Sequence, residues 1–222
     1  MIRFTAALLL APVALAHETI TTKLVWTQEI SRIVNRHCAS CHRAGGKAMS
    51  LTTYEDARPW AKAIRDEVTS RRMPPWGAVE GVGEFRNDPS LSQIEIDMIV
   101  NWVEGGAPKG DDIYLPPAPH FSAESGVERS GREVKVKTGA SITLAIGAEF
   151  GGVRPVQVAP GESLEVTAYI PGGAVEQLIW IRGWRPEWAR TYYFQHPVRL
   201  PKGTRIAVYS GERAEAAMRL AE

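Results

Sequence analysis

Cysteine is scarce in this chain: 222 residues contain only two, Cys38 and Cys41. The net charge of +1 offers no basic surface for a polyanion, so we expect no nucleic-acid partner. The sequence also lacks a clear internal repeat, a Gly-rich phosphate loop, a Ser/His/Asp combination and a histidine cluster of metal-binding type. With 44% hydrophobic and 23% charged residues, the composition is that of an ordinary globular protein with one large or two small cores.

Long hydrophobic runs are also missing. Phe4 to Leu15 is apolar but too short to span a bilayer. Because Arg3 precedes it and Ala14-Leu15-Ala16 forms a small-x-small cleavage site, residues 1–16 are predicted to be a secretory signal peptide. We therefore expect a periplasmic or secreted protein whose mature chain starts at His17 and has no transmembrane segment.

The two cysteines lie together in Cys38-Ala39-Ser40-Cys41-His42. This Cys-x-x-Cys-His pattern is typical of covalent c-type haem attachment. Two thiols on one helical turn can reach the two vinyl groups of one porphyrin, and the next residue then carries its imidazole under the ring to bind the iron. The pattern predicts one covalent haem c on Cys38 and Cys41 with His42 as iron ligand, which leaves no cysteine for a structural disulfide.

Three other interpretations of this motif remain open. A Cys-x-x-Cys pair can be a redox dithiol, but that role usually belongs to a βαβ setting, and the preceding segment has a helical pattern. Half of a zinc site would need a second Cys/His pair at ligand spacing, which the sequence lacks. A chance match is the third. The predicted export signal favours haem attachment, because that reaction follows export.

Residues 17–110 are predicted to form three helices around the haem. The first covers Thr27 to His37, where Ile30, Ile33 and Val34 make an apolar stripe. The second begins at Thr53, as N-cap, and runs to about Ser70. The third begins at Ser92, whose spacing from Glu95 fits a capping box, and ends at Gly105-Gly106.

A Pro-rich linker is predicted over residues 111–123, and the sequence then changes character. In residues 124–222, short apolar runs alternate with Gly/Pro turns, which indicates about eight strands in an antiparallel β-sandwich. The runs are Val134 to Val136, Ile142 to Ile146, Val153 to Val158, Leu164 to Ile170, Gln177 to Ile181, Thr191 to Phe194 and Thr204 to Tyr209. The predicted fold class is therefore multidomain, α plus β: a small all-α domain followed by a β-sandwich.

The sixth ligand of the iron would set its redox role, since a Met sulfur raises the potential and suits electron transfer. Met73 precedes Pro74 and Pro75, which would hold an extended backbone without exposing amide donors to the apolar ring. Met49 lies only seven residues past His42. Seven residues span roughly 23 Å when fully extended, so this stretch could pass round the edge of the ring only under tension. We predict that Met73 is the ligand and that Met98 packs in the core.

A histidine is the main rival for the sixth position. His37 lies too close to the proximal side, while His120 and His196 would have to reach in from the linker or the second domain. Arg71 and Arg72 are candidate partners of the haem propionates, because guanidinium suits carboxylates. A solvated helix end explains this arginine pair equally well.

The order of helix, Cys-x-x-Cys-His, Met-Pro-Pro and helix over residues 27–106 resembles a small class I cytochrome c. In that family the methionine before the prolines is the distal ligand, which the resemblance implies for Met73. More specifically, residues 25–118 resemble cytochrome c domains of a bacterial group fused to copper type II, ascorbate-dependent monooxygenase-like domains. The segments that carry this resemblance are His37 to His42, Met49 to Leu51, Tyr54 to Trp60, Met73 to Trp76 and Leu91-Ser92.

The second domain resembles only the latter half of such a monooxygenase-like region. Trp188, Thr191-Tyr192, Phe194, Pro197-Val198 and Leu200 to Ile206 carry this likeness. Related domains place a His-x-His copper pair in an early strand, but the comparable stretch here, Ala145 to Phe150, has no histidine. The resemblance therefore does not bring monooxygenase chemistry with it, and the β-domain is interpreted as a truncated, metal-free half used for packing or docking.

Together these features predict an exported mono-haem c-type cytochrome that transfers single electrons through a His/Met-ligated haem. It would be an electron carrier rather than a catalyst, with a redox partner protein that could be membrane-associated. The alternative is a haem-containing subunit, or degenerate member, of a copper monooxygenase-like oxidoreductase. A haem-based gas sensor, which would need an open or labile sixth site, is a third hypothesis.

Overall fold

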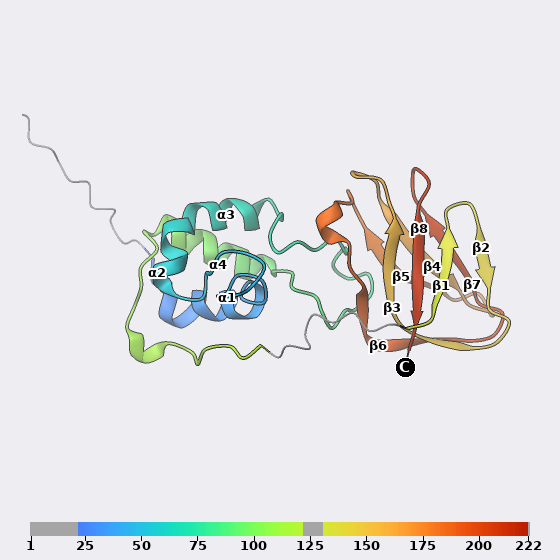
Figure 1. Ribbon diagram of the computed structural model, residues 1–222, viewed down its shortest axis with the longest axis horizontal. Helices are drawn as coiled ribbons and strands as arrows, with labels where there is room; N and C mark the ends of the chain where they lie inside the picture. Colours follow the sequence, from blue (N-terminus) through green and yellow to red (C-terminus); the bar gives the residue numbers. More distant parts are fainter. Residues whose placement is uncertain (1–21, 122–130, 222) are drawn as a thin grey trace, which may run out of the picture.

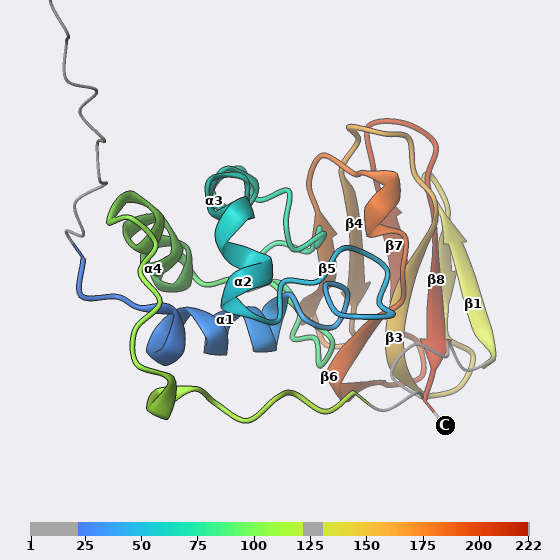
Figure 2. The same ribbon diagram turned by 60° about the vertical axis from the view of Figure 1, so that its left-hand side comes forward.

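The computed structural model describes residues 22–121 and 131–221. The predicted signal peptide and His17 lie outside the described residues. The helices gather at one end of the molecule and two β-sheets pack face to face at the other (Figure 1). Turning the molecule by 60° keeps this separation (Figure 2). None of the helices in the described ranges has the length and apolar character needed to cross a membrane.

The helical part begins with a π-helical turn, η1 (Trp26–Ile30), that continues into α1 (Ser31–His37). The second predicted helix is divided into α2 (Tyr54–Ala57), the 3-10 turn η2 (Arg58–Trp60) and α3 (Ala61–Thr69). Proline in η2 explains the division, because it lacks the amide hydrogen of a continuous helix. The fourth α-helix, α4 (Gln93–Glu104), is followed by the 3-10 turn η3 (Asp112–Tyr114).

Two predicted caps are present. The Thr53 side chain accepts a hydrogen bond from the Asp56 amide at the start of α2. Ser92 and Glu95 form the complete capping box of α4. Thr27 does not cap the first helix: α1 is entered through η1, and the Glu29 carboxylate accepts from the Val25 amide. The helices enclose a core whose largest members are Trp26 and Trp102, with ring centroids 6.0 Å apart.

The β-domain is a sandwich of two four-stranded antiparallel sheets, ordered β1-β8-β3-β6 and β2-β7-β4-β5. Its core is made of the inward side chains of both sheets, among them Phe150, Leu164, Ile179 and Ile206. The strands are β1 (Glu133–Lys137), β2 (Ser141–Thr143), β3 (Ala148–Gln157), β4 (Leu164–Tyr169), β5 (Val175–Ile181), β6 (Tyr192–Leu200), β7 (Arg205–Tyr209) and β8 (Glu215–Leu220).

The multidomain α plus β fold and the antiparallel sandwich predicted from the sequence are confirmed. One strand was not anticipated individually. β8 lies between β1 and β3 and is buried along most of its length, so it has no alternation of apolar and polar residues. Its sequence, Glu-Ala-Ala-Met-Arg-Leu, also favours helix more than strand. Pairing on both sides overrides that local preference.

Residues 76–88 form an excursion from the helical part to the sandwich. In Figure 1 this teal to green segment leaves α3, passes beside the sheets and returns to α4. The Val79 amide donates to the Trp180 carbonyl at 2.8 Å, and the Gln195 amide donates to the Glu84 carbonyl at 2.7 Å. Because β5 and β6 are edge strands of different sheets, this segment, which we call the crossing segment, contacts both sheets at their open edges.

Candidate functional site

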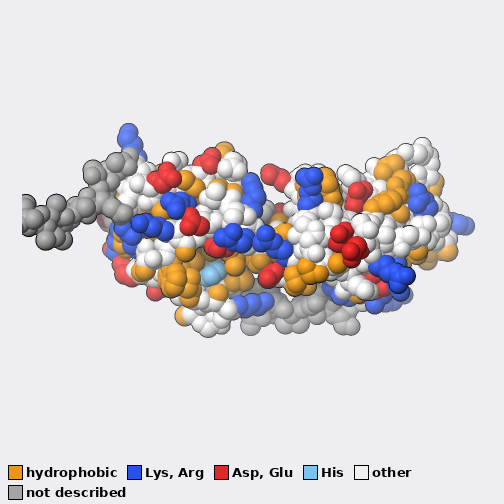
Figure 3. Space-filling model, turned by 90° about the horizontal axis from the view of Figure 1, so that it is seen from above, with side chains coloured by type: hydrophobic (Ala, Val, Ile, Leu, Met, Phe, Trp, Pro, Cys, Tyr) orange, Lys and Arg blue, Asp and Glu red, His pale blue; other side chains and the backbone are white. Residues whose placement is uncertain are grey.

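A cleft of about 450 Å³ opens beside the end of α1. Most of its surface is apolar, and hydrophobic side chains with a histidine are grouped on the helical half of the face seen in Figure 3. All four residues predicted to hold the cofactor line this one cleft, although they come from positions 38 to 73. The lining includes Cys38, Cys41, His42, Met49, Leu51, Trp60, Ile64, Val68, Met73, Pro74, Pro75, Glu187 and Arg190.

The two cysteines lie on the turn that ends α1. The Cys38 carbonyl accepts from the amides of Cys41 and His42 at 3.0 and 2.9 Å, which curls the motif into one tight turn. The two thiols form no disulfide. Burial, and secondarily the neighbouring Cys41, raises the pKa of Cys38 to about 12. A redox dithiol acts through a thiolate of lowered pKa, so this setting disfavours the dithiol interpretation.

His42 is oriented by a main-chain acceptor. Its Nδ1 lies 3.0 Å from the Met49 carbonyl oxygen, and a proton on Nδ1 satisfies that contact. The Nε2 atom then keeps its lone pair for a metal. Metal-bound histidines generally use one ring nitrogen as ligand while the other donates a hydrogen bond to a carbonyl or carboxylate. The imidazole is therefore arranged as an iron ligand on the wall of the cleft.

Met73 is tethered on both sides in sequence. Its amide donates to the Glu67 carbonyl at 3.3 Å, which fixes it to the last turn of α3. Three residues later, Trp76 is buried in the core of the β-domain. Between these anchors, 41% of Met73 is exposed, and it lines the cleft. A large apolar side chain held partly exposed beside a cleft is available to a ligand there.

The other two candidate methionines have different surroundings. Met49 also lines the cleft and is 46% exposed, but its own carbonyl oxygen is the acceptor of His42 Nδ1. It therefore lies on the side of the histidine. Met98 is half-buried on α4, packs against the helical core and is not among the residues that line the cleft.

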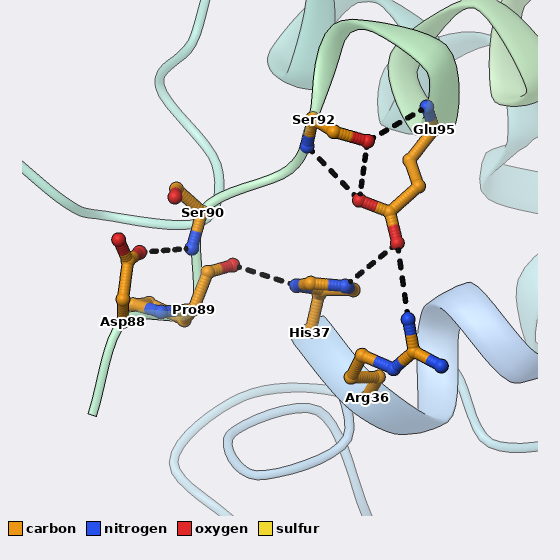
Figure 4. A network of polar contacts seen from close by, with 7 residues as sticks. All are labelled: Arg36, His37, Asp88, Pro89, Ser90, Ser92 and Glu95. Carbon is orange, nitrogen blue, oxygen red and sulfur yellow. Dashed lines mark hydrogen bonds and ion pairs between the residues drawn. The ribbon is translucent and has the colours of Figure 1, made fainter. Parts of the chain in front are cut away.

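His37 belongs to a network of polar contacts rather than to a ligand set. Its Nδ1 lies 3.0 Å from the Pro89 carbonyl and its Nε2 3.0 Å from the Glu95 carboxylate (Figure 4). The same carboxylate accepts from Ser92, and Arg36 lies 3.5 Å away. Both ring nitrogens are thus engaged, and the network joins the end of α1 to the start of α4 at the wall of the cleft, which His37 and Pro89 line.

The pKa of Glu95 reflects this network. Burial raises it, but the hydrogen bonds from the Ser92 main chain and side chain, together with nearby His37, outweigh burial and hold the pKa below its usual value. From their spacing in the sequence, Ser92 and Glu95 are predicted only as a helix cap. His37, directly before the motif, is the sequence feature that could have indicated the wider network. Its two partners lie more than fifty residues away, so no local pattern predicts the contacts.

The remaining histidines do not reach the cleft. His120 is exposed after η3, and His196 is exposed on β6. Neither lines the cleft. Within residues 22–121 and 131–221, no three His, Cys, Asp or Glu side chains gather closely enough to hold a metal ion. His42 and Met73 are therefore candidate ligands for a metal whose remaining ligands come from an organic cofactor and not from the protein.

Arg71 and Arg72, weighed as propionate partners, point to other groups. Arg71 donates to the Gln93 side chain, and Arg72 forms a two-point ion pair with Glu67. Neither lines the cleft. The structure instead brings Glu187 and Arg190 of the β-domain to the cleft, and sequence reasoning missed both because they are more than a hundred residues from the motif.

The residues of the cleft fit a haem. The cavity is wide and apolar, as a porphyrin ring requires, and two thiols, an imidazole with a free nitrogen and a thioether line it. Thioether and imidazole ligands together are typical of cytochromes c. The cleft is also open to the surface, so a ring bound there would keep an exposed edge.

Comparison with known families agrees with this geometry. Residues 27–103 match the family described as cytochrome C oxidase, cbb3-type, subunit III. No curated protein matches the chain. The match ends at the close of α4 and leaves the β-domain outside it. The match covers the cytochrome segment alone, so the fusion to a copper monooxygenase-like domain stays a prediction. The match thus supports a class I c-type cytochrome domain over residues 27–103, a kind of domain that binds haem c and transfers electrons.

Proposed function

We propose that the chain is an exported, mono-haem electron carrier in which His42 and Met73 are the two axial ligands. Cys38 and Cys41 hold the haem through thioether bonds. The single observation that carries this proposal is that one apolar cleft is lined by the complete set of Cys38, Cys41, His42 and Met73. The predicted signal peptide supports export, since covalent attachment of haem c takes place outside the cytoplasm.

The choice of Met73 over Met49 rests on the two sides of the ring. A haem held by His42 would take its second protein ligand from a segment other than the one that supports this imidazole. Met49 supplies the carbonyl that orients His42, and so lies with the proximal ligand. Met73 belongs to a separate segment, held by α3 and by the β-domain. This arrangement favours Met73 as the distal ligand.

The bound haem would supply a one-electron couple between ferric and ferrous iron. The protein's own residues would control it in three ways. His42, oriented by the Met49 carbonyl, presents a fixed nitrogen. Met73 would supply the second protein ligand, a thioether that raises the potential and suits electron transfer over oxygen chemistry. Leu51, Ile64 and Val68 line the cleft and would keep water from the ring faces.

The β-domain has a packing role in this proposal. Trp76 lies 4.5 Å from Tyr192 and 5.9 Å from Phe85, measured between ring centroids. Gly77 is covered by the Trp188 ring so closely that a Cβ there would stand 2.4 Å from it. The β-domain thus grips the chain just after Met73. Because the ligand is followed by a rigid anchor, it is held near the cleft without depending on the iron.

The test compares two methionine variants of the haem-loaded protein. We expect Met73→Ala to remove the weak near-infrared charge-transfer band of Met-ligated ferric haem, to lower the potential and to let the reduced protein bind CO. Met49→Ala is the matched control, because Met49 lines the same cleft with similar exposure, and we expect it to keep the band. Loss of the band in Met49→Ala but not in Met73→Ala would overturn the assignment.

Copper analysis of the same preparation separates this proposal from the alternative of a copper-dependent oxidoreductase. The electron carrier is expected to contain iron and no tightly bound copper. Stoichiometric copper would contradict it. CO binding tests the gas-sensor alternative: the wild-type reduced protein should resist CO because Met73 occupies the sixth position, and ready binding would indicate an open site.

A further inference from the structure

Arg190 reaches the cofactor cleft from the β-domain. It lies between the 3-10 turn η5 (Pro186–Trp188) and β6, and it lines the cleft together with Glu187. The other lining residues all come from the helical domain and the Met73 segment. The cleft is therefore closed on one side by a part of the chain that the cytochrome family match does not include.

The guanidinium group of Arg190 is incompletely paired. Its centre lies 6.0 Å from the centroid of the Trp76 ring, and Nη2 is 3.4 Å from the Glu187 main-chain oxygen. The Nε atom is buried and has no hydrogen-bond partner. Within the described ranges, no carboxylate forms an ion pair with this side chain. Buried donors are almost always paired, so the free Nε indicates a partner that binds in the cleft.

The chemistry of that partner follows from the guanidinium fork. Nε and one Nη can donate together to the two oxygens of a carboxylate. The other charged or titratable groups on the cleft are less suited: His37 is engaged by Pro89 and Glu95, and Lys47 is exposed. Glu67 pairs with Arg72, and Glu187 is itself anionic. Arg190 is the half-buried cation available for an anion inside the cleft.

We propose that Arg190 binds a propionate of the haem, so that the β-domain supplies part of the cofactor site. This inference rests on the proposed function, because it requires a haem in the cleft. The guanidinium stands beside Trp76, the residue that anchors the Met73 segment to the sandwich. Arg190 would thus hold the edge of the haem, while the neighbouring Trp76 anchors the segment that carries Met73.

A positive charge beside the haem has a measurable consequence. It opposes the extra positive charge of ferric iron and offsets the propionate, so it favours the ferrous state. In Arg190→Gln we expect the ferrous-to-ferric ratio at a fixed solution potential to fall about tenfold, which for a one-electron couple is about 59 mV. Arg190→Lys keeps the charge but not the fork, and its potential should lie between those of the wild type and the Gln variant.

The experiment measures the reduction potential and the propionate-bending band in resonance Raman spectra of the haem-loaded full chain. Arg182→Gln is the matched control, since Arg182 is an exposed arginine of the same domain that stacks on Trp180 at 4.5 Å and does not line the cleft. We expect both readouts to change in Arg190→Gln and neither in Arg182→Gln. The near-infrared band identifies any variant in which Met73 ligation has also changed. If Arg190→Gln is such a variant, Arg190→Lys replaces it: a changed propionate band supports the inference, and an unchanged band overturns it.

Two results would overturn the inference. The first is an Arg190→Gln protein whose potential and Raman band match those of Arg182→Gln. The second is a changed potential with an unchanged propionate band, because the charge would then act without binding the propionate. Neither result would contradict the proposed ligation of the haem by His42 and Met73. A chain that takes up no haem, or lacks the Met-ligated spectrum, would instead refute the proposed function and this inference with it.

Discussion

The two domains differ in how complete their cores are. In the β-domain, inward residues of both sheets meet one another, and Phe150, Leu164 and Ile179 are fully buried. In the helical domain, the residues around the cleft remain partly exposed: Trp60 by 47% and Met73 by 41%. An apolar cleft of this size is costly in water. The core of the β-domain is therefore closed by protein side chains, whereas the cleft of the helical domain leaves apolar side chains exposed, as a cofactor site would.

The crossing segment modifies this contrast. It leaves the helical domain after the proposed distal ligand, places Trp76 in the sandwich core and returns to α4. Asn87 completes the attachment, as its side chain bonds both the Thr191 carbonyl and the Tyr193 amide. The β-domain thus restrains the chain just after Met73, where the helical domain alone leaves the proposed ligand partly exposed.

Removing the attachment of the cofactor should have the largest effect on this contrast. In a Cys38→Ser, Cys41→Ser protein we expect no covalent haem and a helical domain less stable by about 4 kcal/mol or more, the linkage for a ligand at a thousand times its dissociation constant. The β-domain should keep its own transition. Haem staining of denaturing gels and urea unfolding followed by circular dichroism measure the two effects.

Ser40→Ala is the control for the double variant, because Ser40 lies between the two cysteines and should not affect attachment. A helical domain that unfolds at the same urea concentration with and without haem would contradict the idea that its core is completed by the cofactor.

Trp76 is the place where the two domains can be uncoupled. Trp76→Ala should destabilise the β-domain by about 3–5 kcal/mol, as for other large aromatic truncations. It should also loosen Met73, so that the reduced protein binds CO more readily. Phe150→Ala, in the same core but on β3 rather than on the crossing segment, should cost a similar amount and leave CO binding unchanged. Equal CO binding by the two variants would refute the anchoring role.

The smallest predicted effect concerns the contact between His37 and Glu95, which joins α1 to α4 within the helical domain. The folded pKa of Glu95 is lowered, so the stability it contributes is fully present above its unfolded pKa, near 4.5, and is lost as the pH falls through the folded value. Glu95→Gln should lower stability at pH 7 by about 1.5–3 kcal/mol, the usual worth of hydrogen bonds to a charged group. Its stability should then depend less on pH below 4.5.

Urea unfolding at several pH values checks this, with Glu104→Gln as the control, since Glu104 is an exposed carboxylate at the opposite end of α4. If the two variants share one pH profile, the network around His37 does not contribute as the structure indicates.

Local patterns allowed much of the fold to be predicted. Ser92 with Glu95 set the start of α4, and turn residues separated most of the strands. These signals depend on neighbours in sequence. β8 was missed because its burial depends on β1 and β3, which come earlier in the chain. The sequence motif likewise indicated Cys38, Cys41 and His42, because attachment chemistry requires that spacing.

Contacts between distant segments could not be predicted in this way. The acceptor of His42 is a main-chain carbonyl, which any residue type provides. Trp76 follows Met73 by three residues, but it lies in the core of the other domain. Arg190 carries no local pattern at all, and only the packing of η5 against the crossing segment brings it to the cleft.

The optical and near-infrared spectrum of the purified, haem-loaded wild-type protein, recorded oxidised and reduced, tests the central claim most directly. We expect one covalently bound haem c, low-spin in both states, with the near-infrared band of a Met-ligated ferric iron that Met73→Ala removes. A high-spin spectrum, bis-histidine bands or the absence of covalent haem would contradict it.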